Sequence, residues 1–481
     1  MSAKIDNILH LTLDTYLLTL IMVRPDNKLH ELDKAPVGKL LLKYSLPSVV
    51  GMVVMSLYNI IDRMFIGQGV GPDAIAGLAI TFPVMNISAA FGVLIGGGAG
   101  ARTSIVLGQG KKRTAELILG NSLVMTLALG TFYLLVLAIF IDDVLIAFGA
   151  SEKSLPYARD FMMYMLPGLL INNLTFSFSN IMRATGYPKK AMLANFIGAG
   201  MNVILAPIFI FGLKWGIKGA AIATDISMFI SMLYVQKHFT SPQSTIHYCR
   251  GIYRLDSKIL LPIIAVGAAP CIVNTAGCLI NALLNNIVYE HGGDASVAAM
   301  GVLMTFSQLA IMFVLGVCMG MQPIVGFNYG AKRYDRLKRA YWLTLAVGTA
   351  ACLLGTIASV FFPKYVAMIF TTDSELIAAC KHCMPIANCV FWIAAFQIVT
   401  TNFFQSLGRA KKSIFMSLSR QVICLLPLLL FLPRLYKLDG VWISFPISDT
   451  IAALIGLCLL IPEFRLINRL AADMPPHEDA A

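Results

Sequence analysis

The run LPSVVGMVVMSLYNIIDRMFIG, residues 46–67, is long and apolar enough to cross a lipid bilayer, yet it contains Asp62 and Arg63 near its end. A membrane-spanning helix needs about 20 apolar residues, and the chain contains about a dozen comparable runs separated by short loops. Of its 481 residues, 58% are hydrophobic and only 13% are charged. The sequence therefore predicts an all-α integral membrane protein.

The positive charges of the chain are distributed over alternate loops. Basic clusters follow the second, eighth and tenth apolar runs at 111–113, 332–339 and 409–412, whereas the intervening loops carry more acids. Cytoplasmic loops of membrane proteins are enriched in Lys and Arg, so this pattern predicts twelve spans with both termini in the cytoplasm. The net charge of +12 reflects topology, and because the basic residues are not gathered in one patch, nucleic-acid binding is not expected.

The sequence offers no motif for a metal centre or for catalysis. The stretch Cys380-Lys381-His382-Cys383 lacks a second ligand pair, although a structural zinc site needs four ligands. Neither a phosphate-binding loop nor a convergent nucleophile arrangement is present. The run GGGAGA at 96–101 lies inside an apolar stretch, where small residues let helices pack closely. We expect neither an enzyme nor a bound cofactor.

Three stretches of the first half recur in the second half, about 220 residues later. The matches are GQGKKRTAEL from Gly108 with NYGAKRYDRL from Asn328, NIMRATGYPKKA from Asn180 with NFFQSLGRAKKS from Asn402, and GIKGAAIATDIS from Gly216 with LDGVWISFPISD from Leu438. Internal repeats of this size are typical of transporters, in which two halves rock around a central site. We therefore expect two six-helix lobes and alternating access.

These features divide the chain into five segments. They are a cytoplasmic N-terminal extension (1–35), an N-lobe with spans 1–6 (36–236), a cytoplasmic linker (237–257), a C-lobe with spans 7–12 (258–462) and a cytoplasmic tail (463–481). The apolar stretch before Met22 contains Asp14 and is too short to span a bilayer. It is expected to be a helix on the membrane surface or an extension upstream of a start at Met22.

Asp62 is the residue that most needs an explanation. A charged residue at the centre of a span costs about 2.5 to 3.5 kcal/mol, so such residues usually face a cavity and bind ions or protons. Met55, Tyr58 and Asn59 share the Asp62 face of the helix at helical spacing, which predicts a polar stripe directed inward. The alternative is that Asp62 marks the water edge of the span, beside an Arg63 that snorkels outward.

Further polar residues lie within the fifth and sixth apolar runs. Asn195 and Asn202 fall on one face of the fifth run. Thr224 and Asp225 lie in the sixth run. Buried amides in a span either join helices or bind ions. In the second half Asp449 is the only comparable acid, so the ionisable candidates are concentrated in the N-lobe.

Seven stretches, taken in order, carry a family resemblance. They are SLPSVVGMVVMSLYNIIDRMFIG, GAGARTSIVLGQGKK, MRATGYPKKAM, GMNVILAPIFIFG, GIKGAAIATDIS, GVCMGMQPIVGFNYGAKR and FTTDSEL. Between about residue 39 and residue 462 the chain resembles the MATE (multidrug and toxic compound extrusion) transporters, nearest the MepA-like bacterial branch. The resemblance implies a V-shaped protein of twelve transmembrane helices in two pseudo-symmetric lobes. It also implies cation-driven export of bulky, often cationic and aromatic compounds.

The resemblance assigns roles to individual residues. Family members place a coupling acid on the first span, which matches Asp62. An Asn on the fifth span and a Thr on the sixth match Asn202 and Thr224, whereas the family's fifth-span Asp is Ala206 here. These three residues and Asn180 form the candidate set for cation or proton coupling. The coupling ion is expected to be a proton or sodium, and a proton is the simpler choice because it needs only one carboxylate.

The substrate cavity is expected to be lined by Met and Phe, whose soft or flat surfaces suit varied apolar ligands. Candidate residues are Met55, Tyr58, Asn59, Gln308 and Asn281. The expected partners are amphipathic organic cations or other drug-like small molecules, and membrane lipids, for a monomer in the bacterial inner membrane. Two alternatives stay open. One is a flippase for lipid-linked precursors, which a row of basic residues within the spans would favour; the other is a degenerate membrane receptor that transports nothing.

Overall fold

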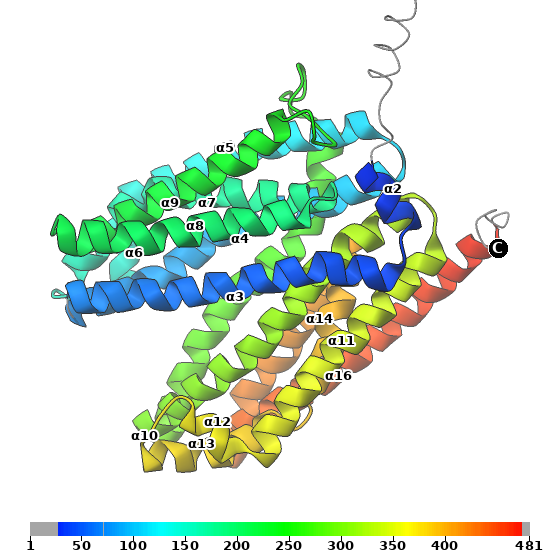
Figure 1. The fold of residues 1–481 in the computed structure, drawn as a ribbon. Coiled ribbons are helices and arrows are strands. Elements are labelled where there is room, and N and C mark those ends of the chain that lie inside the picture. The colour runs from blue at the N-terminus through cyan, green and yellow to red at the C-terminus, as the bar shows by residue number, and fades with distance from the viewer. Residues whose placement is uncertain (1–26, 71, 474–481) are drawn as a thin grey trace, which may run out of the picture.

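The computed structural model describes residues 27–70 and 72–473, and within them every regular element is a helix. The expected all-α class is confirmed, and the helices form two groups (Figure 1). The side chains of nine residues in these ranges are not described; they are Asn27, Asn59, Ile60, Arg63, Pro72, Asp73, Ile75, Ala76 and Cys278. The expectations for residues 1–26 and for the side chains of Asn59 and Arg63 therefore lie outside the described residues.

The first group of helices corresponds to the N-lobe and is preceded by the short helix α2 (Asn27–Lys34). Its helices are α3 (Val37–Gly69), α4 (Pro72–Gly108), α5 (Lys112–Ile139), α6 (Ile141–Ala147), α7 (Leu155–Ala184), α8 (Pro188–Pro207) and α9 (Gly216–Thr240). α8 passes directly into the π-helical turn η1 (Ile208–Gly212). Pro188 begins α8, where its fixed φ and missing N–H cost nothing.

The second group corresponds to the C-lobe. Its helices are α10 (Ser257–Gly330), α11 (Tyr334–Phe361), α12 (Pro363–Met368), α13 (Ser374–Ala387), α14 (Phe391–Ser406), α15 (Ala410–Leu418), the π-helical turn η2 (Ser419–Leu425) and α16 (Leu426–Ala472). Asp256 caps α10 by accepting a hydrogen bond from the backbone N–H of Lys258 at 2.9 Å. Residues 241–256, between α9 and α10, connect the lobes and fall within the predicted linker.

The two lobes repeat a turn that the sequence pairs. Gly186 lies between α7 and α8 with φ +100°, and Gly408 lies between α14 and α15 with φ +71°. Both values fall in the left-handed region that glycine adopts without strain. The two glycines occupy the same place in the matched stretches NIMRATGYPKKA and NFFQSLGRAKKS. The internal repeat is thus reproduced in the backbone.

Two helices of the C-lobe each contain a reversal. α10 has 74 residues and α16 has 47, and a continuous helix of 74 residues would extend about 110 Å against a hydrocarbon core of about 30 Å. Gly293 in α10 and Lys437 in α16 have non-helical φ values of 64° and 50° and break these helices. By length and composition, nine described helices can cross a membrane, or ten if the bent pair α13 and α14 is one span. The expected twelve spans follow only when α10 and the α15–α16 segment are each divided at the break.

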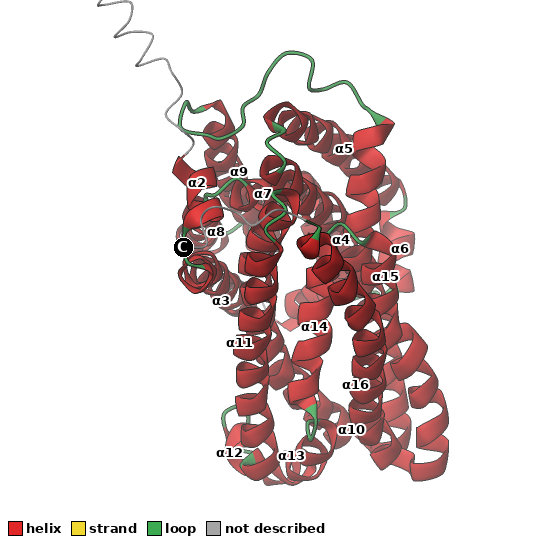
Figure 2. Ribbon diagram, turned by 90° about the vertical axis from the view of Figure 1, so that its right-hand side faces the viewer, coloured by secondary structure: helices red, strands yellow, loops and turns green. Residues whose placement is uncertain are grey.

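The lobes meet at one end of the molecule and diverge at the other. In Figure 1 they converge on the right, where α2 and the C-terminal end of α16 lie, and α6 lies far from α12 and α13 on the left. Figure 2 shows the same helices from the side. One buried apolar cluster includes Leu40 and Phe178 from the N-lobe and Phe403 from the C-lobe. Two further clusters are each confined to one lobe, so the shared core belongs to the convergent end.

Glycines bring the two lobes into backbone contact at this convergent end. A Cβ atom at Gly98 of α4 would overlap the carbonyl group of Ile263 in α10. A Cβ atom at Gly267 of α10 would overlap the carbonyl group of Leu94 in α4. Small residues permit such approach between membrane helices, and the packing role expected for the Gly-rich run at 96–101 is confirmed.

Candidate functional site

The N-lobe encloses a small polar cavity between α3, α7, α8 and α9. Its volume is about 50 Å³. Met55 and Tyr58 line it from α3, and the polar side chains around them are Asn172, Thr175, Asn195, Asn202, Thr224, Ser227 and Ser231. A water molecule takes up about 30 Å³ in the liquid, whereas pockets for drug-sized ligands measure about 300 to 1,000 Å³. The cavity therefore fits water or a small ion.

A hydrogen-bond chain crosses this cavity from α8 to α9. The amide nitrogen Nδ2 of Asn202 donates to Oγ1 of Thr224 at 2.8 Å, and both side chains are buried. Oγ1 of Thr224 in turn donates to the carbonyl oxygen of Ala220 at 2.9 Å, one turn earlier in α9. The hydroxyl group is thereby fixed in orientation. Tyr58 of α3 lines the same cavity, so three helices contribute polar side chains around this pair.

Asp62 lies one helical turn beyond Tyr58 on α3. Its side chain is half-buried, and it does not line the cavity itself. Because Tyr58 lines the cavity and Asp62 follows it at a spacing of four residues, Asp62 lies on the cavity-facing side of α3, as the sequence pattern predicts.

A second carboxylate approaches the same region from α9. Asp225 is half-buried, and its carboxylate packs against the backbone of Gly168 in α7, where a Cβ atom would overlap it. An added Cβ atom at Gly168 would force the carboxylate of Asp225 to move. Asp225 follows Thr224 directly, so the two side chains diverge by about 100° around the helix, and Asp225 does not line the cavity.

The structure brings together four of the predicted site residues. Met55, Tyr58, Asn202 and Thr224 line the cavity, and Asp62 lies one helical turn from Tyr58 on α3.

Asn180 lies elsewhere. Its Oδ1 accepts a hydrogen bond from Nη2 of Arg183 at 2.8 Å, and its side chain packs against Gly96 and Gly100 of α4. Asn281 and Gln308 are exposed on the two halves of α10. The roles proposed for these three residues stay predictions.

Sequence reasoning missed the contributions of α7 and of the later turns of α9. Asn172 and Thr175 of α7, and Ser227 and Ser231 of α9, also line the cavity. Ser227 and Ser231 follow Thr224 at spacings of three and seven residues, which places them on one helix face. That periodicity was a usable signal. The contribution of α7 had no such signal in the sequence, because it depends on how α7 packs against its neighbouring helices.

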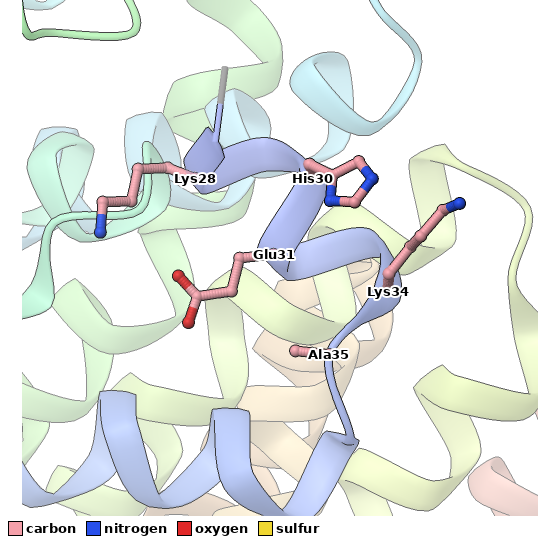
Figure 3. Close-up of a pocket in the computed structure, with 5 residues that line it drawn as sticks. All are labelled: Lys28, His30, Glu31, Lys34 and Ala35. Carbon is pink, nitrogen blue, oxygen red and sulfur yellow. The ribbon is translucent and has the colours of Figure 1, made fainter. Parts of the chain in front are cut away.

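A larger hollow of about 420 Å³ lies beside α2 at the convergent end (Figure 3). Lys28, His30, Glu31, Lys34 and Ala35 line it. Glu31 forms an ion pair with Lys43 of α3, while the side chains of His30 and Lys34 point in another direction (Figure 3). These side chains do not converge on a common point, so we assign the hollow no binding role. Within the described residues no group of three or more His, Cys, Asp or Glu side chains could hold a metal ion.

Comparison with known proteins connects these features to a family. A family model described as MatE matches residues 47–208 and 270–430. "Multidrug export protein MepA" of Staphylococcus aureus (strain MSSA476) is 25% identical over 451 residues, which cover 93% of this chain and 98% of that protein. A "FAD transporter" of Shewanella oneidensis is 27% identical over 430 residues, covering 87% of this chain and 93% of that protein.

Solved structures show the same likeness. "Crystal structure of MATE in the bent conformation" superimposes with a TM-score of 0.86 at 25% identity, covering 92% of this chain and 99% of that chain. "Outward-facing conformation of a multidrug resistance MATE family transporter of the MOP superfamily" gives a TM-score of 0.84 at 25% identity, covering 92% and 98%. The divergence of the lobes in Figure 1 therefore has close structural parallels.

Proposed function

Because this chain belongs to the MatE family, we propose that it is a multidrug exporter that works by cation-coupled antiport. It is a multi-span membrane protein, and its relatives are named as exporters and transporters. We place it in the bacterial inner membrane as a monomer with both termini in the cytoplasm. Its substrates are amphipathic organic cations or other drug-like molecules, and it performs no catalysis.

The observation that supports this proposal best is the size and chemistry of the N-lobe cavity. At about 50 Å³ it is too small for a drug and suits the coupling ion. The polar side chains of Tyr58, Asn202 and Thr224 line it, and Asp62 adds a carboxylate one helical turn from Tyr58. A proton would reside on Asp62, whereas sodium would need several of these oxygens at once. The drug would bind elsewhere, between the diverging lobes.

Helix α3 offers a route by which the ion could act on the lobes. Tyr58 lines the cavity, and Val49, less than three turns earlier, packs against Gly316 in α10 of the C-lobe. An occupant that shifts α3 would therefore disturb the contact between lobes. Ion and drug would each favour a different arrangement, and linkage then requires that each weakens the binding of the other.

The experiment uses purified protein in liposomes with an imposed proton or sodium gradient. Ethidium serves as a cationic substrate and FAD as an anionic one, because one relative is named for FAD. We expect gradient-driven movement of at least one compound, and we expect Asp62→Asn to abolish it while the protein stays folded. The matched control is Asp143→Asn, which neutralises an exposed acid in α6 and should change nothing. Equal gradient-driven transport by Asp62→Asn and the natural protein would refute the coupling role.

A further inference from the structure

The C-lobe contains a buried ion pair at the place that corresponds to the N-lobe cavity. The matched stretches from Asn180 and Asn402 share an offset of 222 residues, and the stretch that contains Gly219 matches the one that contains Gly440 at an offset of 221. These offsets set Gly198 of α8 over Arg420, and Met228 of α9 over Asp449. Gly198 and Met228 both line the N-lobe cavity. Their C-lobe counterparts are two opposite charges.

The pair is close and shielded from solvent. Nε of Arg420 lies 2.6 Å from Oδ1 of Asp449, and the two side chains are 21% and 7% exposed. Oγ of Ser448 donates to the carbonyl oxygen of Arg420 at 2.7 Å, which holds the backbone of η2 against α16. The thiol of Cys352 in α11 also lies near both charges. An isolated buried carboxylate would be strongly unfavourable here, so Asp449 depends on its partner.

At this position the backbone departs from a regular α-helix in the C-lobe but not in the N-lobe. Arg420 lies inside the π-helical turn η2 (Ser419–Leu425). The corresponding residues 197–203 of the N-lobe belong to the regular helix α8, and the π-turn of that lobe, η1, starts only at Ile208. A π-turn widens a helix locally and re-aims its side chains, often at functional sites. In the C-lobe the turn coincides with the residue that reaches Asp449.

We propose that the guanidinium group of Arg420 is a built-in cation, which occupies in the C-lobe the place that an exchangeable ion takes in the N-lobe. Asp449 is then permanently neutralised, and only the N-lobe cavity exchanges an ion during transport. The comparison with the N-lobe rests on the function proposed above. The built-in charge can be tested separately, because the test below measures the C-lobe without any transport.

The test is chemical rescue of Arg420→Gly, the substitution that restores the N-lobe residue at this position. Melting temperatures of the purified protein are measured in millimolar guanidinium chloride and in N-methylglucamine chloride, whose cation is too bulky to enter. We expect Arg420→Gly to melt below the natural protein and guanidinium to recover part of the loss, whereas N-methylglucamine should not. A loss that both salts leave unchanged would show that the pair acts only in packing and would overturn the proposal.

Two further variants keep the proposal falsifiable if Arg420→Gly folds poorly. Arg420→Lys retains a cation and should melt close to the natural protein without a guanidinium response. The double variant Arg420→Gly/Asp449→Met reproduces the N-lobe pair, and it should melt above Arg420→Gly and show no response to guanidinium. A double variant no more stable than the single one would contradict the idea. Arg159→Gly, which breaks an exposed pair with Asp142, is the control and should show no rescue.

Discussion

Helix α3 contributes both to the N-lobe cavity and to the contact between the lobes, but the two regions differ in composition. Polar side chains line the cavity, whereas closely packed glycines form the contact. At the contact, Ser45 and Val49 of α3 lie against Gly320 and Gly316 of α10 with no space for an added Cβ atom. About 9 Å further along α3, Met55 begins the wall of a cavity lined by amides and hydroxyls. The first region has no space for any additional atom, whereas the second has space for one small guest.

This difference suggests a division of labour between the two regions. Closely packed backbones lose dispersion contacts as soon as they separate, so the glycine contacts hold the lobes in register. A polar cavity can gain or lose an occupant without breaking the fold, because its groups hydrogen-bond to either protein or water. Substitutions at the contact should therefore reduce stability first, and substitutions at the cavity should reduce coupling first.

The largest effect is expected from Gly267→Ala in α10. The added methyl group would overlap the carbonyl group of Leu94 in α4, and overpacking of this kind costs about 1 to 3 kcal/mol or more. We expect a lower melting temperature and loss of transport together. The measurement is thermal unfolding of the purified protein, followed by transport in liposomes.

Gly301→Ala is the matched control for this prediction. Gly301 lies in the same helix, and an added Cβ atom there would meet nothing within 4 Å. Alanine favours helix over glycine by up to about 1 kcal/mol, so this variant should be as stable as the natural protein or slightly more so. If the two variants behaved alike, the glycine contact would not hold the lobes.

A smaller and different effect is expected from Thr224→Val, which keeps the shape of the side chain and removes its hydroxyl. The variant loses the acceptor of the Asn202 amide, a contact that is worth about 0.6 kcal/mol on average in membrane proteins. If Thr224 also binds the ion, we expect the apparent affinity for the coupling ion to fall about three- to tenfold, that is by about 0.6 to 1.4 kcal/mol. The measurement is transport rate against ion concentration.

Thr126→Val separates ion binding from helix packing. Thr126 is likewise buried, and its Oγ1 donates to the carbonyl oxygen of Ser122 one turn earlier at 2.7 Å, yet it belongs to α5, away from the cavity. This control should leave the ion dependence unchanged. Equal shifts in both variants would mean that loss of a buried hydroxyl, rather than loss of an ion ligand, explains the effect.

Periodicity along single helices accounts for the part of the site that the sequence predicts. The spacing of Met55 and Tyr58 placed them on one face of α3, and both line the cavity together with Asn202 and Thr224. The fold class followed from the length of the apolar runs, and the internal repeat followed from the matched stretches. Both patterns can be read from the sequence without knowledge of how the helices pack. The position of Asn172 in the cavity wall could not be predicted, because it depends on how α7 packs against its neighbouring helices.

Interactions between lobes and between distant spans were likewise beyond the sequence. Asp449 was recognised as the only acid of its kind in the second half, but its partner Arg420 lies 29 residues earlier, in a π-turn that has no sequence signature. Asn281 and Gln308 were chosen for polarity alone, and both are exposed on α10. A polar residue in a span can face lipid, a neighbour or a cavity, and only packing distinguishes these cases.

The smallest effect is expected from Asp33→Asn. Asp33 lies in α2, a short helix that contributes additional contacts between the lobes. Asp33 forms a two-point ion pair with Arg333, just before α11, with distances of 2.8 and 3.1 Å. Lys28, on the same short helix, packs against Gly186 of the N-lobe. α2 therefore touches both lobes at the convergent end, and its ion pair should help to keep them together.

We expect this substitution to cost only about 0.2 to 1 kcal/mol, because the pair is partly exposed and screened by salt. Arg336 also holds α2 independently, since its Nη2 donates to the carbonyl oxygens of Leu32 and Ala35. Hydrogen exchange of the α2 amides should therefore quicken modestly at low salt, and less at high salt. Asp335→Asn removes an exposed acid nearby and should leave α2 unchanged. A complete loss of α2 protection in Asp33→Asn would show that the ion pair, rather than the Arg336 contacts, holds this helix across the lobes.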